Sequence, residues 1–319
     1  MKAGRQTEAA IWPGKHEIPQ RPQAAAAGRR RLGLTFLPGY GYLPGPLPLS
    51  GPAKDCRIVT SLVLPTYNPG PLVGQTWDAV RRFVSERAAV GDPWEAVFVL
   101  DGCSDGTDDH LTRLAESSGP RMRVVSYAKN RGKGHAVRIG LLAARGTYRV
   151  FTDVDLAYPF EDVLRVAAAL KAGATVAVGS RAHPDSQVTL PARVLGYAYR
   201  RHIQSRVFAT VTRLLLPVTQ RDTQAGLKGM AAATAERVLP ELRCDGFGFD
   251  CELLTACSRS GIPVTEVPVH VRYDSAASTT GLQSTLRMVR ELWQIRKWWR
   301  NRSVPVAATV EPTRLPRAA

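Results

Sequence analysis

The amino-acid sequence predicts an α/β protein with a mostly parallel central sheet that helices cover on both faces. Short apolar runs rich in β-branched residues alternate with helical patterns along residues 57–179. The first four runs each end in a polar turn that contains glycine, aspartate or asparagine. This alternation is typical of parallel sheets, because the chain needs a crossover, usually a helix, to return to the starting edge.

The first half of the pattern gives four strands. They are expected at residues 57–64, 95–100, 123–127 and 148–152. Helices are expected at residues 72–89, from the turn at 101–107 to about residue 115, and at residues 135–144. Polar turns follow these strands at residues 65–70, 101–107, 130–134 and 153–155. Ligands of parallel sheets bind at the carboxyl ends of the strands, so we expect the four turns to converge on one site.

The second half continues less regularly. A helix is expected at 160–172, a strand at 175–179, and a helical region at 193–216 that includes Arg193, Arg200, Arg201, Arg206 and Arg213. A polar turn at 221–226 leads into 227–231, and a helix is expected at 249–258. The strand at 263–273 contains Pro268, which favours an antiparallel or edge position.

Composition limits the class of protein. The chain has 319 residues, a formal charge of +16 and a pI near 10.1, so an anionic partner is expected: nucleic acid, nucleotide, lipid phosphate or an acidic membrane surface. Five cysteines without metal-binding spacing fit a reducing compartment. The sequence shows neither a signal peptide nor an apolar run of the roughly 18–20 residues that span a bilayer. We expect a cytoplasmic protein.

Four segments are predicted. Residues 1–55 form a basic leader rich in Pro, Gly and Ala that we expect to be disordered. The main domain covers residues 56–280, an amphipathic helix covers 281–302, and residues 303–319 form a flexible tail. The helix has a polar face of Arg287, Arg290, Gln294, Lys297 and Asn301 beside an apolar face rich in tryptophan. Such a helix binds an acidic membrane interface or packs on its own core, and the sequence leaves both open.

Asp153 and Asp155 follow the fourth strand. In an extended chain, residues i and i+2 point to the same side, so both carboxylates can meet at one point. Oxygen ligands suit Mg²⁺ or Mn²⁺, and such an ion can take up a diphosphate in its open positions. Two solvated acids at a strand end are the alternative.

With these residues considered together, the chain resembles the family 2 inverting glycosyltransferases, which have the GT-A fold. It is most similar to polyprenyl-phosphate sugar synthases, and within them to the dolichyl-phosphate glucosyltransferase branch. The resemblance spans about residues 57–300 and rests on seven motifs in order, at residues 63–68, 101–107, 130–134, 153–155, 179–181, 222–228 and 249–254. Each motif is weak alone, but their common order is specific.

The resemblance implies a role for each motif. The residues implied to contact the nucleotide are Pro65, Thr66, Tyr67, Asn68, Asp101 and Gly102. Lys133 and its neighbours Gly132 and Gly134 are implied to let the backbone approach the donor. Asp153 and Asp155 are the implied metal ligands, and Arg181 and Lys228 face phosphate groups. Asp222, Gln224 and Asp250 border the sugar and acceptor. Asp155, Asp250 and Arg181 are the implied catalytic residues.

The chain departs from the family pattern in three places. Leu100 replaces the first of two adjacent acids, Cys103 replaces a common serine, and Ala157 stands where mannose synthases often have glutamine. The last departure makes a third side-chain metal ligand doubtful and favours glucose over mannose.

Several residues keep a structural alternative. Asp101 could cap the following helix or turn, Lys133 could be a solvated charge, and Arg181 could be a structural ion-pair partner. Asp250 and Glu252 lie at i and i+2 on a helix and therefore face different directions, and we expect Asp250 to be the one that faces the site.

The resulting hypothesis is metal-dependent, inverting transfer of a hexose from a nucleotide sugar, with UDP-glucose favoured, to a polyprenyl phosphate. The enzyme would attach peripherally to the cytoplasmic face of the membrane. Alternatives are a sugar hydroxyl as acceptor, GDP-mannose as donor, or a membrane-associated scaffold without activity. We expect no nucleic-acid partner, because the basic residues are scattered and not interleaved with aromatic residues. The oligomeric state stays open.

Overall fold

The computed structural model describes residues 34–37, 41–44, 58–189, 206–272 and 282–304. The chain divides into two units, Met1–Ser50 and Gly51–Ala319. In the first unit, β1 (Leu34–Leu37) and β2 (Gly41–Pro44) pair antiparallel, where the sequence predicts no regular element. The rest of the predicted leader, most of the predicted tail, and Arg193, Arg200 and Arg201 lie outside the described residues.

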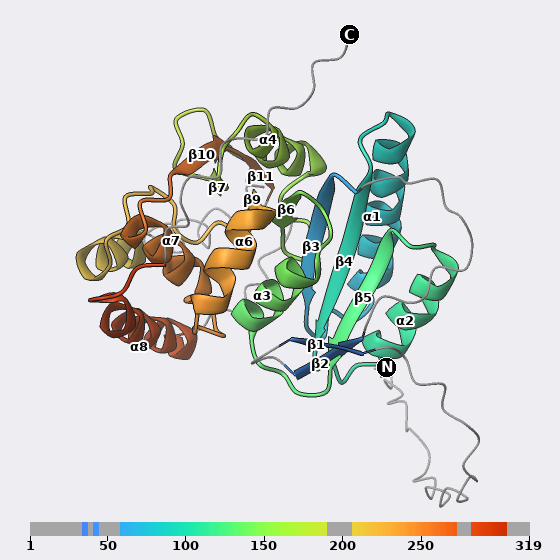
Figure 1. Cartoon of the computed structure of the whole chain (residues 1–319), viewed down its shortest axis with the longest axis horizontal. Helices are drawn as coiled ribbons and strands as arrows, with labels where there is room; N and C mark the ends of the chain where they lie inside the picture. The colour runs from blue at the N-terminus through green and yellow to red at the C-terminus, as the bar shows by residue number, and fades with distance from the viewer. Residues whose placement is uncertain (1–33, 38–40, 45–57, 190–205, 273–281, 305–319) are drawn as a thin grey trace, which may run out of the picture. The chain divides into compact units, whose positions relative to one another are not determined.

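The second unit is built on a seven-stranded sheet in the order β10-β7-β9-β6-β3-β4-β5 (Figure 1). Its strands are β3 (Thr60–Thr66), β4 (Trp94–Asp101), β5 (Met122–Tyr127), β6 (Tyr148–Phe151), β7 (Val176–Ser180), β9 (Lys228–Ala231) and β10 (Val264–Pro268). All neighbouring pairs are parallel except the two that β9 makes with β6 and β7. The predicted mostly parallel sheet is therefore confirmed.

Helices cover both faces of this sheet, as predicted. They are α1 (Leu72–Ala89), α2 (Thr107–Ser117), α3 (Lys133–Ala143), α4 (Phe160–Lys171), α6 (Ala232–Val238), α7 (Phe249–Arg259) and α8 (Leu282–Trp299), with a 3₁₀ turn at Leu239–Glu241 and a further helix at residues 206–215. Figure 1 shows α3 on one side of the strands and α1 on the other.

Alternation along β3 explains this division. Leu62 and Leu64 join one buried cluster with Trp77 of α1. Val63 points to the opposite face, where a Cβ added to Gly140 of α3 would overlap its Cγ1 atom. Because successive strand residues point to opposite faces, one strand supplies the packing surface for both helices. Gly140 lets α3 approach the sheet closely.

Two regions differ from the expectation. The predicted strand at 263–273 is two strands: β10 lies at the sheet edge parallel to β7 and ends at Pro268, and β11 (His270–Arg272) pairs in parallel with β8 (Gln187–Thr189). The edge position is correct and the antiparallel alternative is wrong. Strand β9 is inserted antiparallel in the middle of the sheet, where the sequence indicates only a segment following a polar turn.

Helix α8 uses its apolar face within its own domain. Met288, Leu292, Ile295 and Trp299 are buried, and α8 packs against α7. For these residues, the predicted alternative in which the helix packs on the core of its own domain is therefore correct. Trp293 lies on another side of the helix and is 60% exposed. Among the described residues, no helix combines the length and hydrophobicity needed to cross a bilayer.

Candidate active site

The turn after β3 is fastened to the turn after β4. Asn68, at φ +43°, accepts a hydrogen bond from the Ser104 backbone N–H over 2.8 Å. The backbone N–H of Gly70 donates to Oδ2 of Asp105 over 2.9 Å. Of the predicted nucleotide-binding residues here, Pro65 and Thr66 are buried at the strand end, whereas Tyr67 and Asn68 are exposed. Tyr67 therefore presents an open aromatic ring beside a fixed turn.

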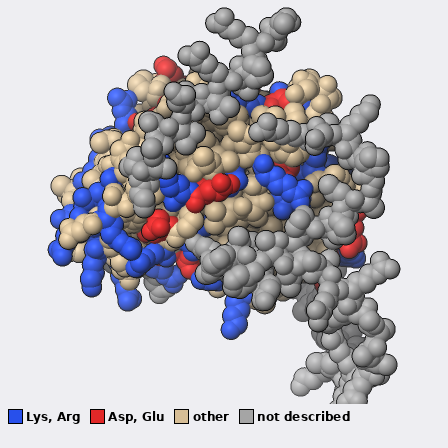
Figure 2. Space-filling model, in the orientation of Figure 1, with Lys and Arg blue, Asp and Glu red and all other residues tan. Residues whose placement is uncertain are grey.

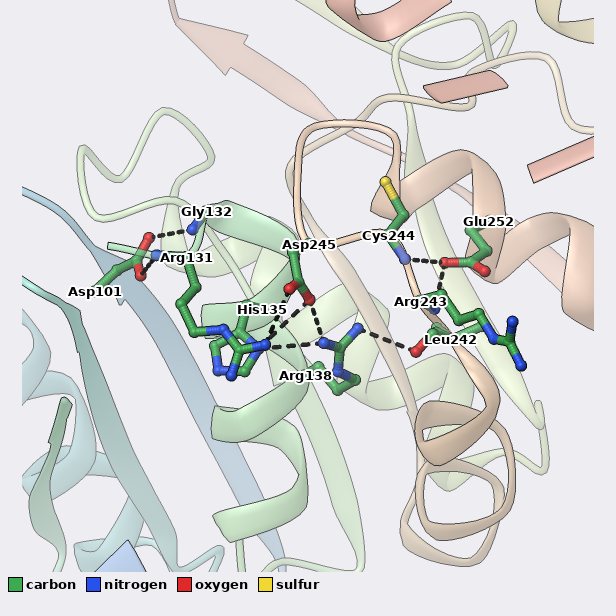
Figure 3. Close-up of polar contacts among 10 residues, drawn as sticks. All are labelled: Asp101, Arg131, Gly132, His135, Arg138, Leu242, Arg243, Cys244, Asp245 and Glu252. Carbon is green, nitrogen blue, oxygen red and sulfur yellow. Dashed lines mark hydrogen bonds and ion pairs between the residues drawn. The ribbon is translucent and has the colours of Figure 1, made fainter. Parts of the chain in front are cut away.

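Asp101, at the end of β4, holds the loop that precedes α3 (Figure 3). It is buried, and its carboxylate accepts hydrogen bonds from the backbone N–H groups of Arg131 (2.7 Å) and Gly132 (2.9 Å) and from the Asn130 side chain (3.0 Å). It does not cap the following helix α2, whose N-cap has no side-chain hydrogen bond. The predicted nucleotide contact of Asp101 stays a prediction, while its contact with the loop is evident.

Gly102 completes this attachment. It has φ +62°, and a Cβ at this position would overlap the backbone N of Asn130 and lie 2.5 Å from the carbonyl carbon of Lys129. Only glycine fits both the backbone conformation and the space. At Gly102 one protein loop therefore approaches another, and the nucleotide contact expected of this residue stays a prediction.

Lys133 begins α3 and contacts the first aspartate of the D-x-D motif. Its Nζ atom lies 2.5 Å from Oδ1 of Asp153. Burial alone would lower the pKa of Lys133, but the charges of Asp153, Asp250 and Asp155 raise it above its ordinary value. Lys133 is therefore an ammonium ion held among carboxylates. The alternative of a solvated surface charge is wrong.

The glycines on either side of Lys133 allow a close approach of the loop before α7. A Cβ on Gly134 would lie 2.5 Å from Cβ of Phe249 and 2.7 Å from the carbonyl oxygen of Cys244, and one on Gly132 would lie 2.5 Å from the carbonyl oxygen of Asp245. Atoms of residues 244–249 therefore lie close to the backbone of both glycines, and only glycine leaves room for them. The expected approach of this backbone to the donor stays a prediction.

Asp153 and Asp155 lie in the turn after β6. Partial desolvation and then the charge of Asp153 raise the pKa of Asp155, so the two carboxylates are close enough to repel. The side chain of Asp155 accepts a hydrogen bond from the N–H of Ala157 over 3.1 Å. Asp153 reaches its position beside Lys133 because residue 226 is glycine: a Cβ there would overlap Oδ2 of Asp153.

This donor set fits a divalent metal that keeps most of its positions for other ligands. Among the described residues, no cluster of three or more His, Cys, Asp or Glu side chains could hold a metal ion alone. Mg²⁺ is commonly held by one or two carboxylates together with substrate phosphates and water. The two aspartates suit this kind of site. In this structure the ammonium group of Lys133 provides the positive charge beside the two carboxylates.

Arg181, after β7, forms a two-pronged ion pair with Asp222. Its Nε lies 2.7 Å from Oδ2 and its Nη2 lies 3.0 Å from Oδ1 of the carboxylate. Burial would raise the pKa of Asp222, but Arg181 lowers it below the usual range. The N–H of Gln224 donates to the same carboxylate over 3.1 Å, which fixes the 222–224 turn. Arg181 is therefore an ion-pair partner of Asp222, and its expected contact with a phosphate group stays a prediction.

Lys228, at the start of β9, is fully buried and contacts Asp250. Its Nζ donates to Oδ1 of Asp250 over 2.8 Å and to the carbonyl oxygen of Ala225 over 2.6 Å. Lys228 is therefore already paired in this structure, and its expected contact with a phosphate group of donor or acceptor stays a prediction. The start of α7, which carries Asp250, packs against the start of α3, since a Cβ on Gly134 would lie 2.5 Å from Cβ of Phe249. The charge of Asp250 accordingly contributes to the raised pKa of Lys133.

Glu252 points away from this group. Its carboxylate accepts hydrogen bonds from the backbone N–H groups of Arg243 (2.9 Å) and Cys244 (2.6 Å) and from Nε1 of Trp299 (2.9 Å). It therefore joins α8 to the loop before α7. Asp250 is the member of the pair that lies near Lys133, in agreement with the expectation.

Sequence analysis missed Asp245. Its carboxylate forms ion pairs with Arg131 (3.3 Å) and Arg138 and lies 3.4 Å from Nδ1 of His135 (Figure 3). Burial opposes ionisation, yet His135 and Arg138 lower the pKa of Asp245 to about 2. Asp245 thus fixes the loop at residues 242–248 against the start of α3. The Asp-Gly-Phe-Gly run at residues 245–248 was the available signal for a constrained loop.

Comparison with known proteins agrees with this geometry. The model of the family "Glycosyl transferase family 2" matches residues 61–232, more than half of the chain. A dolichyl-phosphate beta-glucosyltransferase of Drosophila melanogaster is 31% identical over 245 residues, which cover 74% of this chain and 73% of the relative. The enzyme of the same name from Saccharomyces cerevisiae is 29% identical over 259 residues, covering 76% and 75%.

Among solved structures, glucosyl-3-phosphoglycerate synthase from Mycobacterium tuberculosis aligns with a TM-score of 0.51 and 21% identity, covering 76% of this chain and 79% of that one. This likeness concerns the fold alone. The sheet and its polar edge define a glycosyltransferase of the GT-A fold. The chain belongs to glycosyl transferase family 2 and is similar to its polyprenyl-phosphate sugar synthases.

Proposed function

We propose that this enzyme transfers a glucosyl residue, with inversion, from UDP-glucose to a polyprenyl phosphate at the cytoplasmic face of a membrane, and that it needs Mg²⁺ or Mn²⁺. The observation that carries the proposal is the contact of Lys133 with Asp153, next to Asp155 and Asp250. Two carboxylates with a neutralising lysine at the carboxyl edge of the sheet suit a substrate that brings a metal and a diphosphate. The similarity to dolichyl-phosphate beta-glucosyltransferases supports the choice of sugar and acceptor.

The donor half of the site would bind the nucleotide. Tyr67 and Asn68 would contact the base and ribose from the turn that Ser104 and Asp105 hold in place. Asp153 and Asp155 would hold the metal, which when bound supplies positive charge to the departing diphosphate. The diphosphate oxygens would compete with the Asp153 carboxylate for the ammonium group of Lys133. When the donor binds, Lys133 would therefore leave Asp153 and pair with the diphosphate.

The acceptor half would position the lipid phosphate. A phosphate oxygen forms a bond to the anomeric carbon, the bond from that carbon to the diphosphate oxygen breaks, and the electron pair leaves with the nucleoside diphosphate. The second ionisation of a phosphate monoester has a pKa of about 6, so no base has to remove a proton. Asp250, paired with Lys228, would then orient the acceptor rather than act as a base.

The acceptor phosphate still requires cationic side chains. Arg181 and Lys228 each already neutralise a carboxylate, so they are weaker candidates than the sequence indicates. Arg193, Arg200 and Arg201, outside the described residues, stay candidates for this task.

A sugar hydroxyl as acceptor is the second candidate. The observation that favours it is the carboxylate of Asp250 near Lys133, since a hydroxyl nucleophile would need a general base. With this acceptor, Asp250→Asn protein that circular dichroism shows to be folded would have no transfer activity. With a phosphate acceptor the substitution would chiefly weaken acceptor binding.

The test is transfer of radiolabelled sugar from UDP-glucose and, in parallel, GDP-mannose to polyprenyl phosphate in detergent, with and without Mg²⁺. We expect UDP-glucose to give a metal-dependent product that can be extracted into organic solvent. The Asp155→Asn variant should not form this product. A product from GDP-mannose alone would overturn the choice of sugar. Donor hydrolysis without lipid product would favour the hydroxyl acceptor. No product and no thermal shift with UDP-glucose and Mn²⁺ would favour the scaffold alternative.

A further inference from the structure

A second polar region lies outside the candidate active site, where α7, α8 and the helix at residues 206–215 meet. A groove of about 370 Å³ runs between them. Three arginines line it, Arg259 from the end of α7 and Arg296 and Arg300 from the end of α8, and the segment Leu214–Pro217 forms its other wall. We call it the arginine groove.

Two of the three guanidinium groups are held in place by backbone carbonyls. Nη1 of Arg296 donates to the carbonyl oxygen of Leu215 over 2.7 Å, and Nη2 of Arg259 donates to that of Arg300 over 2.8 Å. Throughout the part of the chain that the structure describes, none of the three arginines pairs with a carboxylate. A guanidinium carries five N–H donors, so most of these donors stay free for an anion.

Three like charges at one groove indicate an anionic ligand, and arginine matches the geometry of phosphate oxygens. The surroundings are basic too: Figure 2 shows Lys and Arg side chains gathered at the lower left, where Figure 1 places α8. These charges alone would be enough to bind a free phosphate ion, so a lipid ligand requires a further feature.

The rim of the arginine groove adds an apolar component. Leu214 lines the groove and is 75% exposed, and Val207, seven residues earlier on the same helix face, is 59% exposed. Trp293 lies one turn before Arg296 and is also largely exposed. Single exposed apolar residues are ordinary, but these three accompany the arginines on two neighbouring helices. Arginine beside leucine and tryptophan is the composition of a lipid-binding surface.

We propose that the arginine groove binds the phosphate of an anionic phospholipid, while Leu214, Val207 and Trp293 enter the boundary between headgroups and acyl chains. The groove then attaches the catalytic domain to the membrane that carries the lipid acceptor. The inference rests on the proposed function only for the purpose of membrane attachment. Binding to a bilayer itself requires neither the nucleotide sugar nor the polyprenyl phosphate.

The test is co-sedimentation of the full chain with phosphatidylcholine vesicles that contain or lack phosphatidylglycerol. The test variant is Arg259→Gln with Arg296→Gln and Arg300→Gln. The matched control, Arg81→Gln with Arg82→Gln and Arg113→Gln, removes the same charge from α1 and α2. Since each basic residue near an anionic surface contributes about fivefold, we expect roughly a hundredfold weaker binding for the test variant and little change for the control.

Three results would overturn the proposal: equal losses for both triple variants, equal binding of wild type to neutral vesicles, or unchanged binding after Leu214→Ser with Trp293→Ser. The last result, together with competition by inorganic phosphate, would identify a free-phosphate site. If the triple variant does not fold, Arg300→Gln alone serves, since the side chain of Arg300 makes no hydrogen bond with the described residues. Vesicle binding without any sugar transfer would contradict the proposed function and leave this inference intact.

Discussion

The ammonium group of Lys228 and the carboxylate of Asp250 form a buried ion pair, with 2.8 Å between Nζ and Oδ1. The lysine side chain is fully buried and that of Asp250 is 9% exposed. Each charge therefore depends on the other for its compensation. The pair joins the first residue of β9 to the first turn of α7 beneath the candidate active site.

Loss of either partner should destabilise the fold strongly. We expect Lys228→Met or Asp250→Leu alone to lower the free energy of unfolding by about 3–5 kcal/mol, because each leaves an uncompensated buried charge. The double variant should recover much of this loss, since it buries no charge. Urea unfolding of the four proteins measures the coupling. Additive losses in the double variant would show that the two side chains act independently.

Replacement of Lys133 should separate metal binding from catalysis. In Lys133→Met, the carboxylate of Asp153 loses its competing cation, so we expect Mn²⁺ to bind more tightly in the absence of nucleotide. Sugar transfer should fall by at least about tenfold, because the diphosphate loses a cationic partner. Calorimetry with Mn²⁺ and the transfer assay give the two readouts. Lys129→Met, at an exposed position in the same loop, is the control. Weaker Mn²⁺ binding in Lys133→Met would contradict the competition.

Gly226→Ala should disable the site while the sheet stays intact. A Cβ at residue 226 would overlap Oδ2 of Asp153 and push this carboxylate out of line with Lys133. We expect transfer to fall about a hundredfold, as is usual when a ligand is displaced by about 1 Å. The control is Gly74→Ala on α1, where the nearest atom is His110 Nε2 at 3.8 Å and alanine should be neutral or stabilising. Similar transfer rates for the two variants would exclude the proposed role of Asp153.

Stability in acid should depend on Asp245. Its pKa in the folded protein is about 2, below the ordinary 3.8, so its contribution is complete above about pH 5 and is lost as the pH falls toward 2. The carboxylate is 32% exposed, and with solvent screening we expect about 1 kcal/mol. The difference in unfolding free energy between wild type and Asp245→Asn should therefore shrink between pH 5 and pH 3. A constant difference over this range would show that the Asp245 charge does not contribute.

The parallel half of the fold could be predicted because its signals are local. Each strand from β3 to β6 is an apolar run ended by a polar turn, and the bounds of α1 and α8 agree with the periodicity of their residues. Strand β9 has only four residues, Lys-Gly-Met-Ala, and no alternating pattern, so only its pairing with β6 and β7 defines it.

The candidate site was predictable in position and less so in contacts. The carboxyl edge follows from topology, but the partners of Lys133, Arg181 and Lys228 depend on side chains at least 20 residues away along the chain. Asp245 was missed for the same reason: its partners lie on α3 and in the loop before it, more than 100 residues earlier. A linear sequence does not specify which acid neutralises which base.

Strand β9 runs antiparallel to its neighbours, and this reversal decides which parts of the chain meet at the candidate active site. Parallel strands contribute the segments that leave them, whereas β9 contributes the segment that enters it, so Lys228 pairs with Phe151 and Gly226 abuts Asp153. Two stretches of chain separated by about seventy residues are thereby joined side by side at one edge. A protein cut after residue 189 would still contain every residue expected to contact the donor, from Pro65 to Asp155, but not the glycine that leaves room for the Asp153 carboxylate. Because of the reversed strand, both halves of the chain contribute to the candidate active site.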